Sequence, residues 1–188
     1  MDASAGLLSG SIIFEPRPIH DERGFFTRTF DADIAAAAGC DPARFVQDSQ
    51  SRSARGVVRG LHLRTDGGEG KLVRCASGAM VDVAVDLRPA SGTYRMWMTV
   101  VLDDTTHRSV WLPAGLAHGF QALTKWVDVC YRIDRRHEPG YDATIRYDDP
   151  ELDIPWPLPV RGMSERDRNA PALATLESQF DEWFGALS

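Results

Sequence analysis

The sequence predicts a mostly β protein whose short strands form a sandwich or a barrel. Within residues 79–88, apolar side chains such as Val81, Val83 and Val85 alternate with polar or small ones such as Asp82. This period of two is typical of a strand with two different faces. Many short apolar runs between Gly, Pro and Asp residues indicate a sandwich or a barrel. The further strand candidates are residues 12–14, 57–63, 72–76, 96–102, 109–112, 119–123 and 127–133.

A turn signal stands between two of these strands. The dipeptide Ser77-Gly78 separates the candidate strand 72–76 from the alternating segment that follows it. Gly in a two-residue connection is typical of a β-hairpin. We therefore expect the two strands to form a tight hairpin.

Two segments carry helix signals. Residues 32–38 form a short Ala-rich run that Gly39 would end. Residues 170–184 are the second candidate, because Pro171 suits a first helical turn and Gly185 suits a stop. We expect a short helix and a C-terminal helix beside the strands.

The chain reads as one domain. No internal repeat or low-complexity linker interrupts its 188 residues, a length that suits one sizeable core. A Pro- and Asp-rich loop over 147–159 precedes the last helix. We expect one domain over 1–188, with a barrel core over about 12–160 and a C-terminal loop and helix over about 161–188.

Composition excludes several classes of function. The net charge is −6, whereas a general nucleic-acid binder carries a basic surplus. The N-terminus lacks a basic region before its apolar residues, and no apolar run reaches membrane-spanning length. Three widely spaced cysteines give neither a disulfide framework nor a zinc signature. We therefore expect a cytoplasmic protein without nucleic-acid or membrane partners.

His62 is the first candidate for chemistry. On a strand it shares a face with Val58 and Gly60. An imidazole inside a barrel would sit among apolar walls, which can tune it for proton transfer near neutral pH. A hydrogen-bonded core histidine is the alternative, and spacing does not separate the two.

His118 follows a Pro-Ala-Gly turn at residues 113–115, an arrangement that resembles the metal-binding cupin barrels. Those barrels present a His-x-His pair and a Glu in their first motif. Here His62 is followed by Leu63 and Arg64, so that second histidine is missing. Two histidines alone make a poor transition-metal site. We expect no metal.

Four more residues have both a structural and a functional interpretation. Tyr131 is either a core phenol or a proton donor aimed into a cavity, and Lys71 is either a solvated strand-end residue or part of a site. Arg23 and Arg59 are either surface ion-pair partners or diphosphate ligands, since guanidinium binds phosphate with two hydrogen bonds. No Rossmann or P-loop fingerprint is present, so those nucleotide folds are excluded.

A series of motifs runs in order from about Phe14 to Pro171. The motifs are DERGFF at 21–26, FVQD at 45–48, VRGLH at 58–62, KLV at 71–73, DVAVDLR at 82–88, PAGLAHGF at 113–120, DDP at 148–150 with WP at 156–157, and SERD at 164–167. Together these motifs resemble the dTDP-4-dehydrorhamnose 3,5-epimerase family, and such a series is far more specific than any one motif.

The resemblance implies a cupin-type antiparallel β-barrel, or jelly roll, that is usually a homodimer. It implies cofactor-independent epimerisation at C3, C5 or both of a nucleotide-diphospho-4-keto-6-deoxyhexose. The catalytic matches are His62 as base, Asp167 as its dyad partner, Lys71 beside the ketone oxygen and Tyr131 as the opposite proton donor. The substrate-binding matches are Arg23 and Arg59 for the diphosphate, Phe26 and Gln47 for the nucleotide, and His118 for the sugar.

The chemistry accounts for these residue types. A carbon next to a ketone loses its proton only if the enolate is stabilised, which an ammonium group can do. A carboxylate beside the base favours the imidazolium that forms. The alternatives are a keto-sugar isomerase and a non-catalytic sugar-nucleotide-binding cupin. The filled positions of the base, the acid and the dyad argue against both.

The sequence departs from the family pattern at positions near the nucleotide. Arg28 stands where the family usually has an acidic residue, and Asp48-Ser49 replaces its usual x-Asn. The segment after the catalytic tyrosine, at 134–139, lacks the tyrosines often found there. We hypothesise that the nucleotide is CDP, GDP or UDP instead of dTDP. A measured binding preference for dTDP over these three would contradict this.

Overall fold

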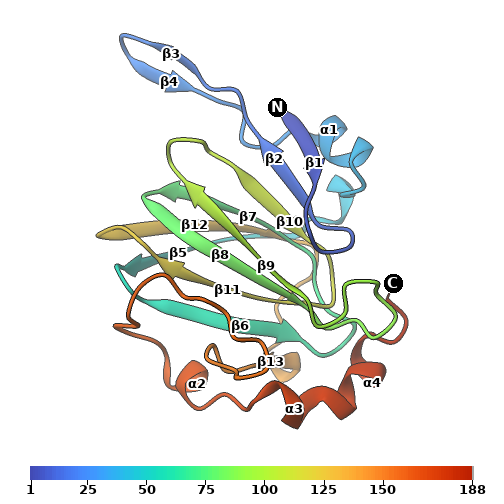
Figure 1. Cartoon of the computed structure of the whole chain (residues 1–188). Helices are drawn as coiled ribbons and strands as arrows, with labels where there is room; N and C mark the ends of the chain where they lie inside the picture. The colour runs from blue at the N-terminus through green and yellow to red at the C-terminus, as the bar shows by residue number, and fades with distance from the viewer. Residues whose placement is uncertain (188) are drawn as a thin grey trace.

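The computed structural model describes residues 1–187 and is mostly antiparallel β structure in three sheets, with short helices (Figure 1). One large sheet contains, in spatial order, β1 (Asp2–Ala5), β2 (Ile12–Glu15), β10 (Ser109–Leu112), β7 (Lys71–Ser77), β12 (Trp126–Ile133) and β5 (Gln47–Ala54). The other contains β13 (Asp142–Thr144), β6 (Val58–Arg64), β11 (Leu116–Ala122), β8 (Ala79–Asp86) and β9 (Trp97–Asp103).

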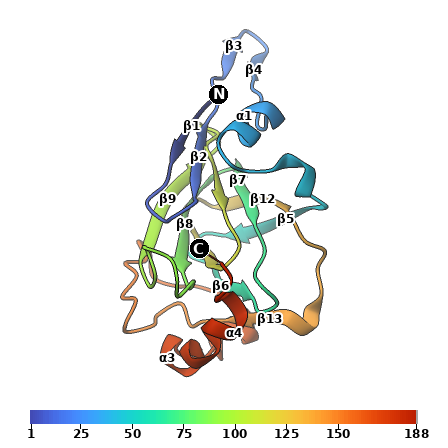
Figure 2. The same cartoon turned by 90° about the vertical axis from the view of Figure 1, so that its right-hand side faces the viewer.

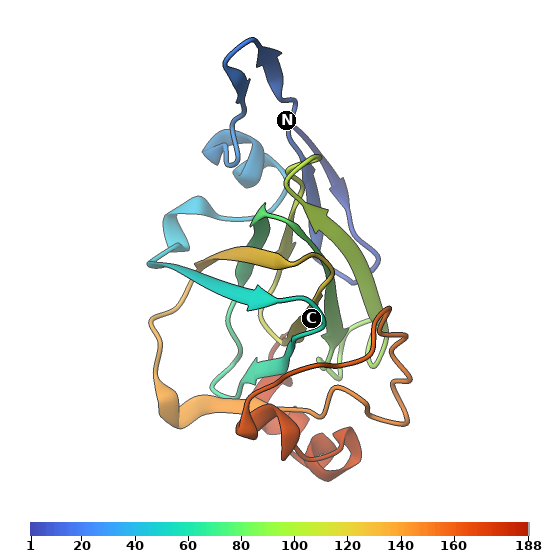
Figure 3. The same ribbon diagram turned by 90° about the vertical axis from the view of Figure 1, so that its left-hand side faces the viewer.

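The third sheet is a small hairpin of β3 (Ile19–Asp21) and β4 (Gly24–Phe26). It projects from the body of the molecule in all three views (Figures 1, 2 and 3). The helices are α1 (Ala32–Ala37), α2 (Glu165–Arg168), α3 (Leu173–Leu176) and α4 (Phe180–Phe184). Three single 3₁₀ turns are η1 (Pro42–Arg44), η2 (Pro139–Tyr141) and η3 (Glu177–Gln179).

The two large sheets face each other across the main core. Buried side chains of both sheets meet there, including Val73 of β7, Val129 of β12, Ala84 of β8 and Phe120 of β11. Within residues 1–187 no strand pairing joins one large sheet to the other along an edge. The antiparallel β architecture is therefore confirmed as two open, facing sheets, and their inner faces enclose the core.

The outer faces of both sheets are covered. α1 and its neighbours pack with Phe14, Leu72 and Trp111 on the outer side of the six-stranded sheet. The C-terminal helices pack against the five-stranded sheet, where Leu173 and Phe180 are fully buried. Figures 2 and 3 show α3 and α4 at the opposite end of the molecule from the β3–β4 hairpin.

The alternation predicted for β8 is correct, but both of its faces are buried. Val83 and Val85 face the C-terminal helices, and Met80 and Ala84 face the core between the sheets. A central strand covered on both sides has no solvent face. The polar residues of β8 are therefore buried too, Asp82 among them.

The predicted hairpin at Ser77-Gly78 is wrong. β7 pairs with β10 and β12, whereas β8 pairs with β11 and β9, so this turn carries the chain from one sheet to the other. Gly78 has φ +81°, and a Cβ there would lie 2.3 Å from the carbonyl oxygen of Trp126. A crossover and a hairpin both use Gly for positive φ, so the dipeptide alone does not separate them.

One predicted helix is confirmed and the other is corrected. α1 begins after Asp31, whose carboxylate accepts hydrogen bonds from the N–H groups of Asp33 and Ile34. The C-terminal helix is not continuous, because α3, η3 and α4 follow one another as short turns. Its first residues are not helical, since the Pro171 carbonyl instead accepts a hydrogen bond from the Arg146 N–H.

Replacing Gly78 by Ala should destabilise the fold by about 1–3 kcal/mol, because the new methyl group meets a backbone carbonyl and the positive φ disfavours Ala. Gly92→Ala is the matched control, since a Cβ at Gly92 has no heavy atom within 4 Å. Urea unfolding of both variants measures the difference. Equal stabilities would contradict the role assigned to Gly78.

Candidate active site

A cavity of about 270 Å³ lies between the inner faces of the two large sheets. Strands β5, β7 and β12 contribute from one sheet, and β6 and β11 contribute from the other. The lining residues are Ser49, Gln50, Ser51, Arg59, His62, Lys71, His118, Gly119, Phe120, Tyr131 and Ile133. Five of the residues predicted from the sequence, Arg59, His62, Lys71, His118 and Tyr131, are thus brought together.

The predicted pair of His62 and Asp167 is present as a contact. His62 Nε2 lies 2.8 Å from Asp167 Oδ1, and the Gly60 N–H donates to Asp167 Oδ2 at 3.3 Å. Asp167 lies on α2, whose N-cap Ser164 accepts a hydrogen bond from the Asp167 N–H. The short capped helix therefore delivers a carboxylate to a histidine that is distant in the sequence.

Asp167 is held in its ionised form although it is only 2% exposed. Burial opposes ionisation, but the hydrogen bonds and charge of His62, with the Gly60 N–H, outweigh it. The pKa of the Asp167 carboxyl therefore lies below its ordinary value. The ionised carboxylate can accept a hydrogen bond from the His62 ring and so fixes its orientation.

An irregularity in β6 explains how Arg59 also reaches the cavity. Strict alternation from His62 would place Arg59 on the opposite face of the strand. The pairing of β6 with β11 shifts register between the His118 and Phe120 positions, and both Arg59 and His62 line the cavity. Gly60 permits the close approach of the strands, because a Cβ there would lie 2.5 Å from the Gly119 Cα.

A second His–Asp pair faces the same cavity. His118 Nε2 lies 2.7 Å from Asp82 Oδ1, and both side chains are buried. His118 is the direct cross-strand partner of His62, and its ring meets that of Tyr131 edge-on at 6.2 Å. Asp82 was missed by the sequence reasoning, which assigned it only to the polar face of an alternating strand.

Tyr131 enters the cavity from the sheet that faces His62. It shares a face of β12 with Val127 and Val129, as predicted. Its hydroxyl lies 3.3 Å from Ser51 Oγ on β5. Desolvation raises the pKa of the Tyr131 phenol to about 12, although the hydrogen bond to Ser51 lowers it in part. The phenol is therefore protonated at neutral pH.

Ion pairs and hydrogen bonds to neighbouring side chains hold Lys71, Arg59 and Gln47 in place. Lys71 Nζ forms an ion pair with Glu69 at 2.9 Å, and its side chain is 12% exposed. Arg59 Nε donates to Ser53 Oγ at 2.9 Å. Gln47 lies at the start of β5 beside the cavity, where its amide donates to Ser49 Oγ.

Arg23 and Phe26 are not brought into this cavity. Both lie on the projecting β3–β4 hairpin, where Phe26 is 74% exposed and Arg23 forms an ion pair with Asp21. Arg28, just after the hairpin, forms an ion pair with Asp31. The sequence placed all of these residues in one site, but the single chain separates the hairpin from the rest.

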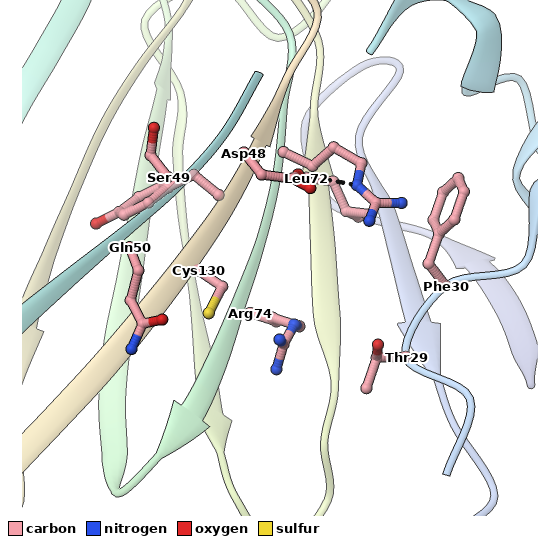
Figure 4. A pocket seen from close by; sticks show the side chains of 10 residues that line it. Thr29, Phe30, Asp48, Ser49, Gln50, Leu72, Arg74 and Cys130 are labelled. Carbon is pink, nitrogen blue, oxygen red and sulfur yellow. Dashed lines mark hydrogen bonds and ion pairs between the residues drawn. The ribbon is translucent and has the colours of Figure 1, made fainter. Parts of the chain in front are cut away.

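A second hollow of about 350 Å³ lies on the outer face of the six-stranded sheet, where Leu72 and Arg74 line it (Figure 4). Ser49, Gln50 and Tyr131 line both spaces. Thr29 and Phe30, which follow β4, form the far wall, and the Arg132 guanidinium lies over the Phe30 ring at 4.5 Å. The segment that follows the hairpin thus lies against the outer face of this sheet, which separates it from the cavity.

Within residues 1–187, no group of three or more His, Cys, Asp and Glu side chains is placed to hold a metal ion. None of the described helices is long and apolar enough to cross a membrane.

Comparison with known proteins agrees with the fold. The family model described as dTDP-4-dehydrorhamnose 3,5-epimerase matches residues 6–175. A dTDP-4-dehydrorhamnose 3,5-epimerase of Methanothermobacter thermautotrophicus is 46% identical over 165 residues, which cover 86% of this chain and 89% of that protein.

Two solved structures extend the likeness to the whole architecture. A 4-keto-6-deoxy sugar epimerase of Streptomyces spheroides superposes with a TM-score of 0.90 at 37% identity, over 95% of this chain and 90% of that one. An epimerase of Legionella pneumophila, solved with dTDP-4-keto-L-rhamnose, gives a TM-score of 0.89 at 37% identity, over 95% and 96%.

The fold, the cavity and these likenesses define a carbohydrate epimerase, an enzyme of the isomerase class. More closely, the chain belongs to the dTDP-4-dehydrorhamnose 3,5-epimerase family.

Replacing Asp167 by Asn should lower stability at neutral pH, and the loss should shrink in acid. The folded pKa of Asp167 is depressed below the ordinary value of 3.8. Its contribution is therefore fully present above that value and is lost as pH falls through the folded pKa. Urea unfolding of both proteins from about pH 7 to about pH 3 measures this. A difference that stays constant across the range would contradict the assignment.

Proposed function

We propose that the protein epimerises C3, C5 or both of a nucleotide-diphospho-4-keto-6-deoxyhexose by proton transfer, without a cofactor. One observation carries this proposal. The His62–Asp167 pair and Tyr131 enter one cavity from opposite sheets. A base and an acid on opposite walls address opposite faces of a sugar held between them, which is the arrangement that inversion of a carbon requires.

The proton transfers balance over one inversion. Neutral His62 takes the proton from the carbon beside the ketone, and Asp167 stabilises the resulting imidazolium. The Lys71 ammonium stabilises the negative charge that develops on the ketone oxygen. Tyr131 then donates its proton to the opposite face of the same carbon, and it can do so because its raised pKa keeps it protonated. The products are the inverted sugar, an imidazolium and a phenolate.

The polar residues around this centre suit the rest of the substrate. Arg59 lies beside the His62 wall and is proposed to bind the diphosphate, with His118 against the sugar and Gln47 near the nucleotide. Two of the named relatives are epimerases of dTDP-linked sugars, so a dTDP-linked 4-keto-6-deoxy sugar is the first substrate to test. The hypothesis of another nucleotide remains a prediction.

The alternatives fit the cavity less well. A keto-sugar isomerase moves a proton between neighbouring atoms and does not need an acid on the opposite wall. A non-catalytic binding protein does not need a buried dyad beside the ligand.

We further propose that the two facing sheets constitute a cupin-type barrel in one domain. We also propose that the protein is cytoplasmic, where its three unpaired cysteines stay reduced.

The exchange of sugar protons for deuterium tests the epimerase proposal directly. In D₂O the wild type should introduce deuterium at C3, C5 or both of dTDP-4-keto-6-deoxyglucose, as followed by NMR. His62→Ala and Tyr131→Phe should each reduce the rate of inversion by about 100-fold or more, because each removes one proton-transfer group. Wild-type enzyme that exchanges no proton would contradict the proposal.

The position of Arg23 and Phe26 supports a homodimer. The β3–β4 hairpin carries two predicted substrate ligands and exposes Ile19, Phe25 and Phe26 to solvent. An isolated two-stranded hairpin is only marginally stable in water, so an exposed apolar one calls for a binding surface. We propose that the hairpin of one copy reaches the cavity of a second copy and supplies both side chains there.

Complementation tests this arrangement. A variant with Arg23→Ala and Phe26→Ala keeps its cavity and loses its hairpin ligands, whereas His62→Ala keeps the hairpin and loses the cavity. Co-expressed in equal amounts, the two inactive variants should recover about a quarter of wild-type activity, since half of randomly paired dimers hold one intact site. No recovery, in a sample shown to contain mixed dimers, would place the hairpin in its own chain's site.

A further inference from the structure

Ser51 is the one partner that the described part of the chain offers to the Tyr131 hydroxyl, at 3.3 Å. It lies on β5, the last strand of its sheet, which pairs with β12 alone and leaves its other edge free. Ser51 also lines the cavity. Its hydroxyl therefore lies between the proposed proton donor and an edge of the sheet that no other strand covers.

The proposed base His62 and the proposed acid Tyr131 differ in how each returns to its starting protonation state. The His62 side chain is 35% exposed and is held by the buried Asp167 carboxylate. Within residues 1–187, the Tyr131 hydroxyl has no charged hydrogen-bond partner, and its hydrogen bond is to the neutral Ser51. When a sugar fills the cavity and displaces its water, His62 keeps its route for releasing a proton, whereas Tyr131 depends on Ser51.

Two inversions on one bound sugar require such a reset. After the first inversion, His62 is an imidazolium and Tyr131 is a phenolate. Both must return to their starting states before a second carbon can be inverted. A phenolate in a desolvated cavity is costly, and Tyr131 must regain a proton before it can act as an acid again, so the second inversion needs a proton source within reach of its oxygen.

We propose that Ser51 relays a proton back to Tyr131 while the sugar remains bound, so that both carbons beside the ketone are inverted in one binding event. Ser51 gives its hydroxyl proton to the Tyr131 phenolate and takes one from water at the edge of β5 in the same concerted step. His62 releases its proton to water, so the cycle consumes nothing. This inference rests on the proposed function. It adds to that function that two carbons are inverted in each binding event.

The experiment compares wild type, Ser51→Ala and Ser51→Thr in D₂O on dTDP-4-keto-6-deoxyglucose. The ratio of singly to doubly deuterated sugar is measured by mass spectrometry at early times. This ratio does not depend on how much of a variant is folded, because unfolded enzyme labels nothing. Ser109→Ala is the matched control, since Ser109 is a buried strand serine whose Oγ has no hydrogen-bond partner among residues 1–187.

Wild type and Ser109→Ala should release doubly labelled sugar from the earliest times. Ser51→Ala should raise the share of singly labelled sugar by about 10-fold and lower kcat with little change in KM, because the relay acts on proton transfer and not on binding. Ser51→Thr keeps a hydroxyl and should restore the wild-type ratio.

Two results would overturn the relay. One is a Ser51→Ala variant with the wild-type labelling ratio, and the other is a wild type that releases singly labelled sugar before labelling both centres. A wild type that labels neither centre would instead overturn the epimerase proposal itself, and the relay with it. The two failures are therefore distinguishable in the same samples.

Discussion

The contact between Asp167 and His62 is the constraint on which the rest of the site depends. A buried carboxylate is costly unless it is paired and hydrogen-bonded, and Asp167 at 2% exposure meets that condition through His62 and the Gly60 N–H. The same contact ties the C-terminal segment to β6, where Gly162 also forms a bridge with Val57. The orientation of the imidazole and the position of the C-terminal segment are thus set together, and neither can change without the other.

The two sheets contribute different chemical groups to the cavity. The five-stranded sheet carries two histidines as cross-strand neighbours, each with a buried carboxylate, His62 with Asp167 and His118 with Asp82. The six-stranded sheet carries neutral donors and a cation, with the Tyr131 phenol, the Ser51 hydroxyl and Lys71. Two histidine–carboxylate pairs therefore face a phenol, a hydroxyl and an ammonium group across one cavity.

The sequence pattern predicted the strands that carry apolar residues but missed strands that are mostly polar. It found β7, β8 and β12, but it missed β5, whose residues Gln47–Ala54 are almost all polar because the strand lies at an edge. It also missed Asp82, because a buried carboxylate in an alternating strand has the same pattern as a solvated one. Ser77-Gly78 was wrongly predicted to form a hairpin, because the residues of a turn do not determine which strands pair. Long-range packing determines the pairing.

For the site, the family resemblance supplied what pattern could not. Spacing alone left His62, Lys71 and Tyr131 open, and the structure places all three around one cavity. What neither spacing nor resemblance indicated was the separation of the hairpin, because a motif in sequence order does not say which copy of a chain it serves. Asp21 and Arg23 stabilise the turn of the hairpin locally, so its shape is encoded in the motif although its destination is not.

In the proposed homodimer, the exposed hairpin would couple assembly to substrate binding. Phe26 is 74% and Ile19 is 69% exposed, an arrangement that leaves large apolar surface in water. Burying such side chains against a second copy stabilises the assembly by roughly 1.5–3 kcal/mol for each one fully covered. In the proposed dimer the same burial would carry Arg23 to the cavity, where Arg59 is the other proposed diphosphate ligand. On this view the free energy that holds two copies together is also what positions the diphosphate ligand, so a dissociated chain would retain its proton-transfer groups and lose its hold on the substrate.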